Sequence, residues 1–170
     1  RLRQSENSYR KALQLEPSFI PAYLNLVDLY REQAQDIRGK EILLEALQVV
    51  PHSGIIHHAL GLLLVRANDH SNALIHLEKA LELNPDVSRH GYVFGVALNS
   101  LGNSSKAVDV LENALEDHPY DRDLLFALAT IQRDQGHFKK ALNLAVQLVQ
   151  NNPGNSRYLQ LKHQLELLVP

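Results

Sequence analysis

The chain has 170 residues, of which 45% are hydrophobic, so it can bury a core and does not have the composition of a disordered segment. Its 17 lysine and arginine residues nearly balance 19 aspartate and glutamate residues, with no block of like charge, which argues against nucleic acid as a partner. The absence of cysteine excludes disulfides, thiol catalysis and zinc thiolate sites, and no apolar run reaches the roughly 18 residues of a membrane span.

The first element along the chain is a helix predicted in residues 1–19, the second half of a repeat whose first half is absent. Pro17 ends it, because proline cannot continue a helix. Its apolar positions are Leu2, Tyr9, Ala12, Leu13 and Leu15. Since the chain opens inside a repeat and lacks methionine, we expect a fragment of a longer protein, with any targeting segment upstream and the localisation unknown. The apolar face of this helix is expected to fray or to self-associate.

Proline marks a repeat of 34 residues along the chain. Five of the seven prolines stand on this register: Pro17, Pro51, Pro85, Pro119 and Pro153. A fixed period of this length is typical of a repeat array. Each period carries two apolar stripes with helical spacing, so each repeat is predicted to fold as a pair of helices.

Four complete repeats are predicted, followed by a capping helix. The repeats are 20–53, 54–87, 88–121 and 122–155, and the capping helix is 156–170. The predicted helices are 21–33 and 37–49, 55–67 and 71–83, 89–101 and 104–117, and 123–135 and 138–150, with the last one over 156–169. Together with residues 1–19 they are predicted to form one domain over 1–170.

Cap residues are predicted at both ends of these helices. Side chains that can accept hydrogen bonds from first-turn N–H groups precede the first helix of each repeat: Ser18, Ser53, Ser88, Asp121 and Asn155. Gly102 and Gly136 stand between the two helices of their repeats, where a left-handed C-terminal cap favours glycine. Asn68 takes that place in the repeat 54–87.

Small residues recur where the helices of a repeat are predicted to touch. They are Val27, Gly61, Gly95 and Ala129 in the first helices, and Gly39, Ala73, Ala107 and Ala141 in the second helices. A small side chain lets two helix backbones approach closely, so we interpret these positions as packing spacers.

These motifs resemble the tetratricopeptide repeat. The resemblance rests on the 34-residue period, the pair Leu60-Gly61, the A-x-x-x-L runs that begin at Ala73 and Ala107, and the A-L-x-L-x-P ending at Pro85. It implies an all-α, right-handed superhelical solenoid of antiparallel helix pairs, with the first helices lining an inner groove. The chain departs from the family pattern at one position of the first helix. The family usually has tryptophan there, whereas this chain has Tyr23, His57, Gly91 and Leu125.

The sequence shows no catalytic motif, and no catalytic, cofactor-binding or metal-binding residue is predicted. Nine histidines raise the question of a metal site. His57 and His58 are adjacent, so they point about 100° apart on a helix, and His70 and His76 also lie on different faces. No nucleophile elbow, phosphate loop or zinc-protease motif occurs. We therefore predict that the chain is not an enzyme.

The groove that the resemblance implies is the predicted binding surface. His58, Tyr92 and Phe126 recur at one position of the first helices and are predicted to form an aromatic stripe. The other predicted groove residues are Leu62, Val96, Arg89, Asn99, Thr130 and Arg133. Alternatively, the rings of Tyr92 and Phe126 pack against neighbouring first helices. The lysine–asparagine clamp with which some family members bind a C-terminal carboxylate is not matched, because Leu24, Asp28 and Leu62 occupy its positions.

The favoured hypothesis is a non-catalytic scaffold, part of a larger protein, that binds a protein or peptide in the groove. The alternative is a C-terminal docking extension of a larger, catalytic or redox enzyme. It rests on segments 92–98 and 118–125, which resemble repeat tails of some bacterial multihaem cytochrome proteins, although the chain has no haem-binding C-x-x-C-H motif.

Overall fold

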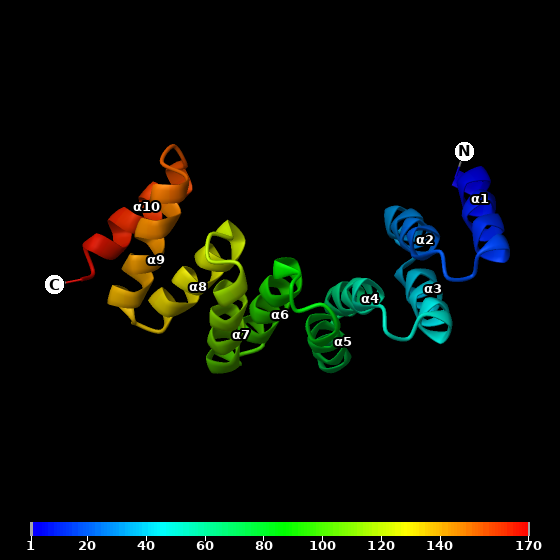
Figure 1. Ribbon diagram of the computed structural model, residues 1–170, viewed down its shortest axis with the longest axis horizontal. Coiled ribbons are helices and arrows are strands. Elements are labelled where there is room, and N and C mark those ends of the chain that lie inside the picture. The colour runs from blue at the N-terminus through cyan, green and yellow to red at the C-terminus, as the bar shows by residue number, and fades with distance from the viewer. Residues whose placement is uncertain (1, 170) are drawn as a thin grey trace. The chain divides into compact units, whose positions relative to one another are not determined.

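The computed structural model describes residues 2–169, which form ten α-helices and no strand (Figure 1). The helices are α1 (Leu2–Leu15), α2 (Ile20–Glu32), α3 (Asp36–Val49), α4 (Gly54–Arg66), α5 (His70–Leu83), α6 (Ser88–Ser100), α7 (Ser104–Asp117), α8 (Arg122–Asp134), α9 (Phe138–Asn151) and α10 (Ser156–Glu166). The chain divides into two compact units, Arg1–Asn84 and Pro85–Pro170. The first unit holds α1 to α5 and the second holds α6 to α10.

The predicted all-α architecture of paired helices is confirmed. Each first helix packs most extensively on the second helix of its own repeat, in the pairs α2–α3, α4–α5, α6–α7 and α8–α9. Both ends of each of these helices lie within one residue of the prediction. The last helix is shorter than predicted: it ends at Glu166, with Leu167 as its C-terminal cap, and Val169, which precedes proline, disfavours helical backbone. The grouping of all repeats into one domain stays a prediction.

Three of the predicted N-terminal caps are confirmed. The Ser53 side chain accepts a hydrogen bond from the Ile56 N–H at the start of α4. Asp121 accepts two N–H bonds at the start of α8, and Asn155 does the same for α10. All three cap residues stand two positions after a repeat proline, so the cap belongs to the 34-residue register.

The predicted caps at Ser18 and Ser88 are wrong. The same register places Phe19 and Val87 at the cap positions of α2 and α6, and neither has a side chain that can accept a hydrogen bond. Ser88 is instead the first residue of α6, and its hydroxyl donates to Asp121 Oδ2 at 2.8 Å.

The left-handed caps at Gly102 and Gly136 are confirmed, with φ values of 83° and 79°. Asn68 also has the predicted left-handed conformation, with φ 57°. Ala34 has φ 55° at the equivalent place between α2 and α3, which the sequence analysis did not foresee. A left-handed conformation costs a residue with a Cβ atom about 1–2 kcal/mol. Local strain is therefore present in the first complete repeat.

The small residues are packing spacers, as predicted. A Cβ atom added to Gly61 of α4 would lie 2.6 Å from Leu77 of α5, and one added to Gly95 of α6 would lie 2.7 Å from Leu111 of α7. Both leucines are fully buried. The close approach of the two helices in these repeats therefore requires glycine at these positions.

Tyr30 joins α1 to the first complete repeat. Its ring is fully buried, and its hydroxyl donates to Glu6 Oε1 at 2.6 Å. Arg10 of α1 and Arg38 of α3 each donate to the Tyr30 hydroxyl at 3.0 Å and also form ion pairs with Glu6. The hydrogen bond from Tyr30 lowers the pKa of Glu6 below its usual value, and the two arginines lower it further against the effect of burial. This cluster stabilises α1 against α2 while Glu6 is ionised, and its contribution is lost as the pH falls through the lowered pKa.

We expect Ala34→Gly to stabilise the protein by about 0.5–1 kcal/mol, because glycine adopts the left-handed conformation without the steric cost of a Cβ atom. Ala67→Gly is the matched control, since Ala67 is exposed, is the C-terminal cap of α4 and has a φ of −78°. It should lower stability by up to about 1 kcal/mol. Urea denaturation of both variants measures the difference, and a loss of stability in Ala34→Gly would contradict the assigned conformation.

Both a smaller and a larger side chain at the contact between α4 and α5 are expected to lower the stability of the protein. Leu60→Ala should cost about 2–5 kcal/mol, because Leu60 is fully buried. Gly61→Val should cost about 1–3 kcal/mol by forcing Leu77 to move. Gly154→Ala is the control, since a Cβ atom there meets nothing within 4 Å, and it should change stability by less than about 0.5 kcal/mol. Denaturant melts in which all three variants match wild type would disprove the helix packing.

Candidate functional site

In the first unit, residues of α2 and α4 line an open pocket of about 230 Å³. Its predicted members are His58 and Leu62, both half-buried. The complete lining is Leu24, Val27, Asp28, Arg31, Ile55, His58, Ala59, Leu62 and Arg66. The wall is therefore mainly aliphatic, with charged groups at the edge. Asp28 and Arg31 form an ion pair at 3.0 Å, and Arg66 pairs with Asp36 of α3 at 2.9 Å.

In the second unit, residues of α6, α8 and α10 line a separate pocket of about 270 Å³. Four predicted groove residues belong to it: Tyr92, Val96, Phe126 and Thr130. The remaining lining residues are Asp123, Ala127, Asn155, Arg157 and Tyr158. The Thr130 hydroxyl bonds to carbonyl oxygens of α8 itself, so the aromatic and charged groups supply the distinctive chemistry of this pocket.

Arginine lies over two of the three aromatic rings of the second pocket. The Arg157 guanidinium is 4.1 Å from the centre of the Phe126 ring, and the Arg89 guanidinium is 5.4 Å from the centre of the Tyr92 ring. Such cation–π contacts contribute about 0.5–1 kcal/mol at exposed sites. These contacts hold the planar guanidinium groups beside the rings. From there the guanidinium groups can donate hydrogen bonds to an acceptor group of a bound partner.

Phe126 also packs within the protein, as the alternative interpretation expected. Its ring lies 5.8 Å from the ring of Tyr158 on α10 and contacts the buried cluster of Leu125, Leu148 and Tyr158. Both Tyr92 and Phe126 nevertheless stay half-buried, which leaves part of each ring exposed. Phe126 thus stabilises the end of the array and also lines the pocket.

Two predicted groove residues have local partners outside these pockets. The Asn99 side chain accepts a hydrogen bond from the Ser104 hydroxyl at 2.7 Å, which joins α6 to α7. Arg133 forms an ion pair with Asp134 at 2.8 Å. His58 lies in the first unit and Tyr92 and Phe126 in the second, and a continuous stripe of all three stays a prediction.

Asp123, Arg157 and Tyr158 also line the second pocket; the register predicted the first two to face the groove, although they are not among the groove residues named above, whereas Tyr158 was not predicted. Asp123 and Arg157 stand four residues after their repeat prolines, at the position where Arg89 was predicted to face the groove. The repeat register therefore contained the signal for both. Tyr158 could be placed in the pocket only from the packing of α10.

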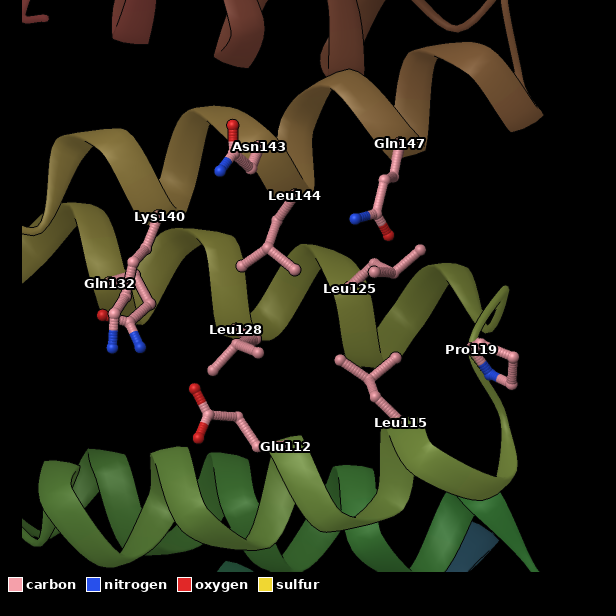
Figure 2. A pocket seen from close by; sticks show the side chains of 10 residues that line it. All are labelled: Glu112, Leu115, Pro119, Leu125, Leu128, Gln132, Lys140, Asn143, Leu144 and Gln147. Carbon is pink, nitrogen blue, oxygen red and sulfur yellow. The ribbon is translucent and has the colours of Figure 1, made fainter.

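A further pocket of about 370 Å³ lies on the opposite side of α8, between α7 and α9 (Figure 2). Leu115 of α7 and Leu144 of α9 extend toward α8, where Leu125 and Leu128 form the floor. Glu112, Lys140, Asn143 and Gln147 are the polar residues on the two second helices. No prediction concerned this surface. Among the described residues 2–169, no group of three or more potential metal ligands is brought together.

Comparison with protein families decides the architecture. Residues 54–87 and 98–165, together more than half of the chain, match family models described as tetratricopeptide repeat. The chain belongs to the tetratricopeptide repeat family. Tetratricopeptide repeats form protein-interaction scaffolds, and the first-helix surfaces described above belong to such a scaffold.

Solved structures, one of them described as a tetratricopeptide repeat protein, have the same fold. PilF of Pseudomonas aeruginosa superposes with a TM-score of 0.82 at 20% identity, over 98% of this chain and 76% of that chain. YrrB is described as a tetratricopeptide repeat protein with an unusual peptide-binding site. It superposes with a TM-score of 0.75 at 24% identity, over 95% of this chain and 84% of that chain. MamA superposes with a TM-score of 0.75 at 18% identity, over 90% of each chain.

A curated human relative is much longer than this chain. Protein O-mannosyl-transferase TMTC3 of Homo sapiens is 23% identical over 138 residues, which are 79% of this chain and 15% of that protein. The chain therefore spans about one seventh of that relative. In residues 2–169 of the present chain, no helix has the length and apolar character needed to cross a membrane.

Proposed function

We propose that this tetratricopeptide repeat array is a non-catalytic scaffold that binds an extended segment of a partner protein along its first helices. One observation carries the proposal. The pockets of the two units share the same repeat positions. In each pocket, one first helix contributes the residues seven and eleven positions after its repeat proline. The first helix of the next repeat contributes the residues four, seven, eight and eleven positions after its own proline. The repeat thus presents equivalent binding surfaces along the array.

The side chains of these surfaces suit a peptide with apolar and polar groups. In the first unit Leu24, Ile55 and Leu62 offer aliphatic surface. In the second unit, Tyr92 and Phe126 offer half-exposed rings with arginine beside each one. Rigid aromatic side chains and arginine are the residue types that contribute most to binding at protein interfaces. The proposal assigns the anchoring role to these groups.

A docking extension of a larger enzyme is the second candidate function. The observation that favours it is the match to 15% of a longer protein whose name describes a transferase. In that case the array would serve its own polypeptide, and the surface of α1 would matter more than the pockets. Leu15 of α1 is 80% exposed, whereas Tyr9 and Leu13 pack against the core of the first unit. Self-association through α1 stays a prediction that light scattering at rising concentration can test.

The test of the proposed function selects binders from a displayed library of random peptides with the 170-residue chain as bait. The variant Tyr92→Ala/Phe126→Leu removes both aromatic anchors, and leucine retains apolar volume beside Tyr158. Each aromatic anchor is worth about 1 kcal/mol or more at an interface, so we expect the selected peptides to bind this variant at least about tenfold more weakly. Titration calorimetry measures the affinities, and a urea melt verifies that the variant folds.

The matched control is Lys140→Ala/Gln147→Ala, which changes the pocket between α7 and α9 on the other side of α8. Its affinity should stay within about twofold of wild type, which corresponds to about 0.4 kcal/mol. The opposite result would overturn the proposal. If the peptides bound Lys140→Ala/Gln147→Ala more weakly and Tyr92→Ala/Phe126→Leu as tightly as wild type, the binding surface would lie on the second helices.

A further inference from the structure

Two histidines from different helices contact each other in the second repeat. His57 Nδ1 of α4 lies 2.9 Å from His76 Nδ1 of α5, and the two half-buried rings stack with centroids 5.1 Å apart at an angle of 28°. The contact joins two helices, so spacing within a helix could not predict it.

A third group determines which nitrogen carries the proton. His57 Nε2 lies 3.2 Å from the carbonyl oxygen of Pro51, which can only accept a hydrogen bond. His57 Nε2 must therefore be the protonated nitrogen of a neutral ring, and its Nδ1 is an acceptor. The bond between the rings is then donated by His76 Nδ1, which requires the Nδ1–H tautomer of His76.

The charge of the pair determines whether this bond exists. With one added proton, one ring still donates to an unprotonated nitrogen of the other ring. When both rings are protonated, both facing nitrogens carry hydrogen, no acceptor remains, and two positive charges face each other. The hydrogen bond is thus replaced by repulsion only in the doubly protonated state.

The surroundings of the pair disfavour added positive charge. Burial lowers the pKa of His76 below its usual value, and the neighbouring His57 and then Lys40 of α3 lower it further. On α5 itself, the next charged group one turn on is Lys79, which forms an ion pair with Glu82 at 2.9 Å. The charged group that α3 directs at His76 is thus a cation.

The equivalent contact in other repeats is apolar. His57 and His76 occupy the positions of Tyr23 and Ile42 in the first complete repeat, which belong to one buried cluster. In the fourth repeat the same positions hold Leu125 and Leu144, which also pack together. The second repeat therefore has a pair of histidines where the first and fourth repeats have apolar packing.

We propose that the His57–His76 pair is a pH-sensitive contact that holds α4 against α5 near neutral pH and loosens the second repeat in mild acid. The helix α4 carries Ile55, His58 and Leu62, which form one wall of the first pocket. Loosening α4 therefore lowers affinity for a peptide in that pocket. This last consequence rests on the proposed function, whereas the contact itself does not.

The direction of the effect follows from the lowered pKa of His76. A histidine whose pKa is lower in the folded state contributes stability that is complete above its unfolded pKa of about 6.5. That contribution is lost as the pH falls through the folded pKa. Protection of α4 and α5 should therefore be high near pH 7.5 and fall toward pH 5, with the other repeats as an internal reference.

Amide hydrogen exchange of the 170-residue chain at about pH 7.5 and about pH 5, corrected for intrinsic exchange rates, tests the proposal. Relative to α8 and α9, the protection of α4 and α5 should fall several-fold in acid, in the direction that the lowered pKa of His76 requires. His57→Leu/His76→Leu copies the leucine pair of the fourth repeat and should abolish the fall. His70→Gln, an exposed histidine at the start of α5, is the matched control and should retain it.

A second variant, His76→Gln, covers the case in which the leucine pair disturbs folding, because glutamine can donate to His57 without titrating. It should also abolish the fall. Unchanged relative protection of wild type in acid, or an equal fall in the variants that lack the pair, would overturn the proposal. Because exchange is measured without a peptide, these outcomes do not depend on whether the first pocket binds one.

Discussion

The close approach of the two helices in each repeat is the constraint on which the rest of the structure depends. Gly61 lies against Leu77, and Gly95 lies against Leu111, so closely that a single added Cβ atom would overlap the leucine in either repeat. This contact fixes which face of each first helix is buried. The adjacent face is then free to line a pocket, and the 34-residue period presents that face again in the next repeat.

The same constraint explains why most of the fold could be predicted from the sequence. Proline, glycine and the small residues are determined by backbone geometry, so they recur with the period and define the helix ends of the four complete repeats within one residue. The cap residues were less predictable because the cap position is fixed by register, while the residue there varies. Ser18 and Ser88 are good capping residues one position away from the true caps, Phe19 and Val87.

The candidate site was only partly predictable, because its chemistry depends on contacts between helices. The first-helix register holds the positions of Tyr92, Phe126 and Arg157, which line one pocket, but the contact of Arg157 with the Phe126 ring depends on the packing of α10. The sequence also could not show that Ser104 binds Asn99 or that Phe126 packs on Tyr158. The contact between His57 and His76 was missed for the same reason, since the two residues share no helix.

The chemistry of the two pockets thus depends on departures from a regular repeat. The backbone register supplies equivalent surfaces, and the side chains that differ between repeats give each surface its own chemistry. Aliphatic residues line the pocket of the first unit, and aromatic rings with arginine line the pocket of the second.

Site-specific photo-crosslinking to a library-selected peptide tests the central claim most directly. A photoreactive phenylalanine analogue at Val96 would lie in the pocket of the second unit, and one at Asn143 would lie on the other side of α8. The account predicts that the peptide is crosslinked from Val96 and not from Asn143. Crosslinking from Asn143 alone would show that the partner binds the second helices and would contradict it.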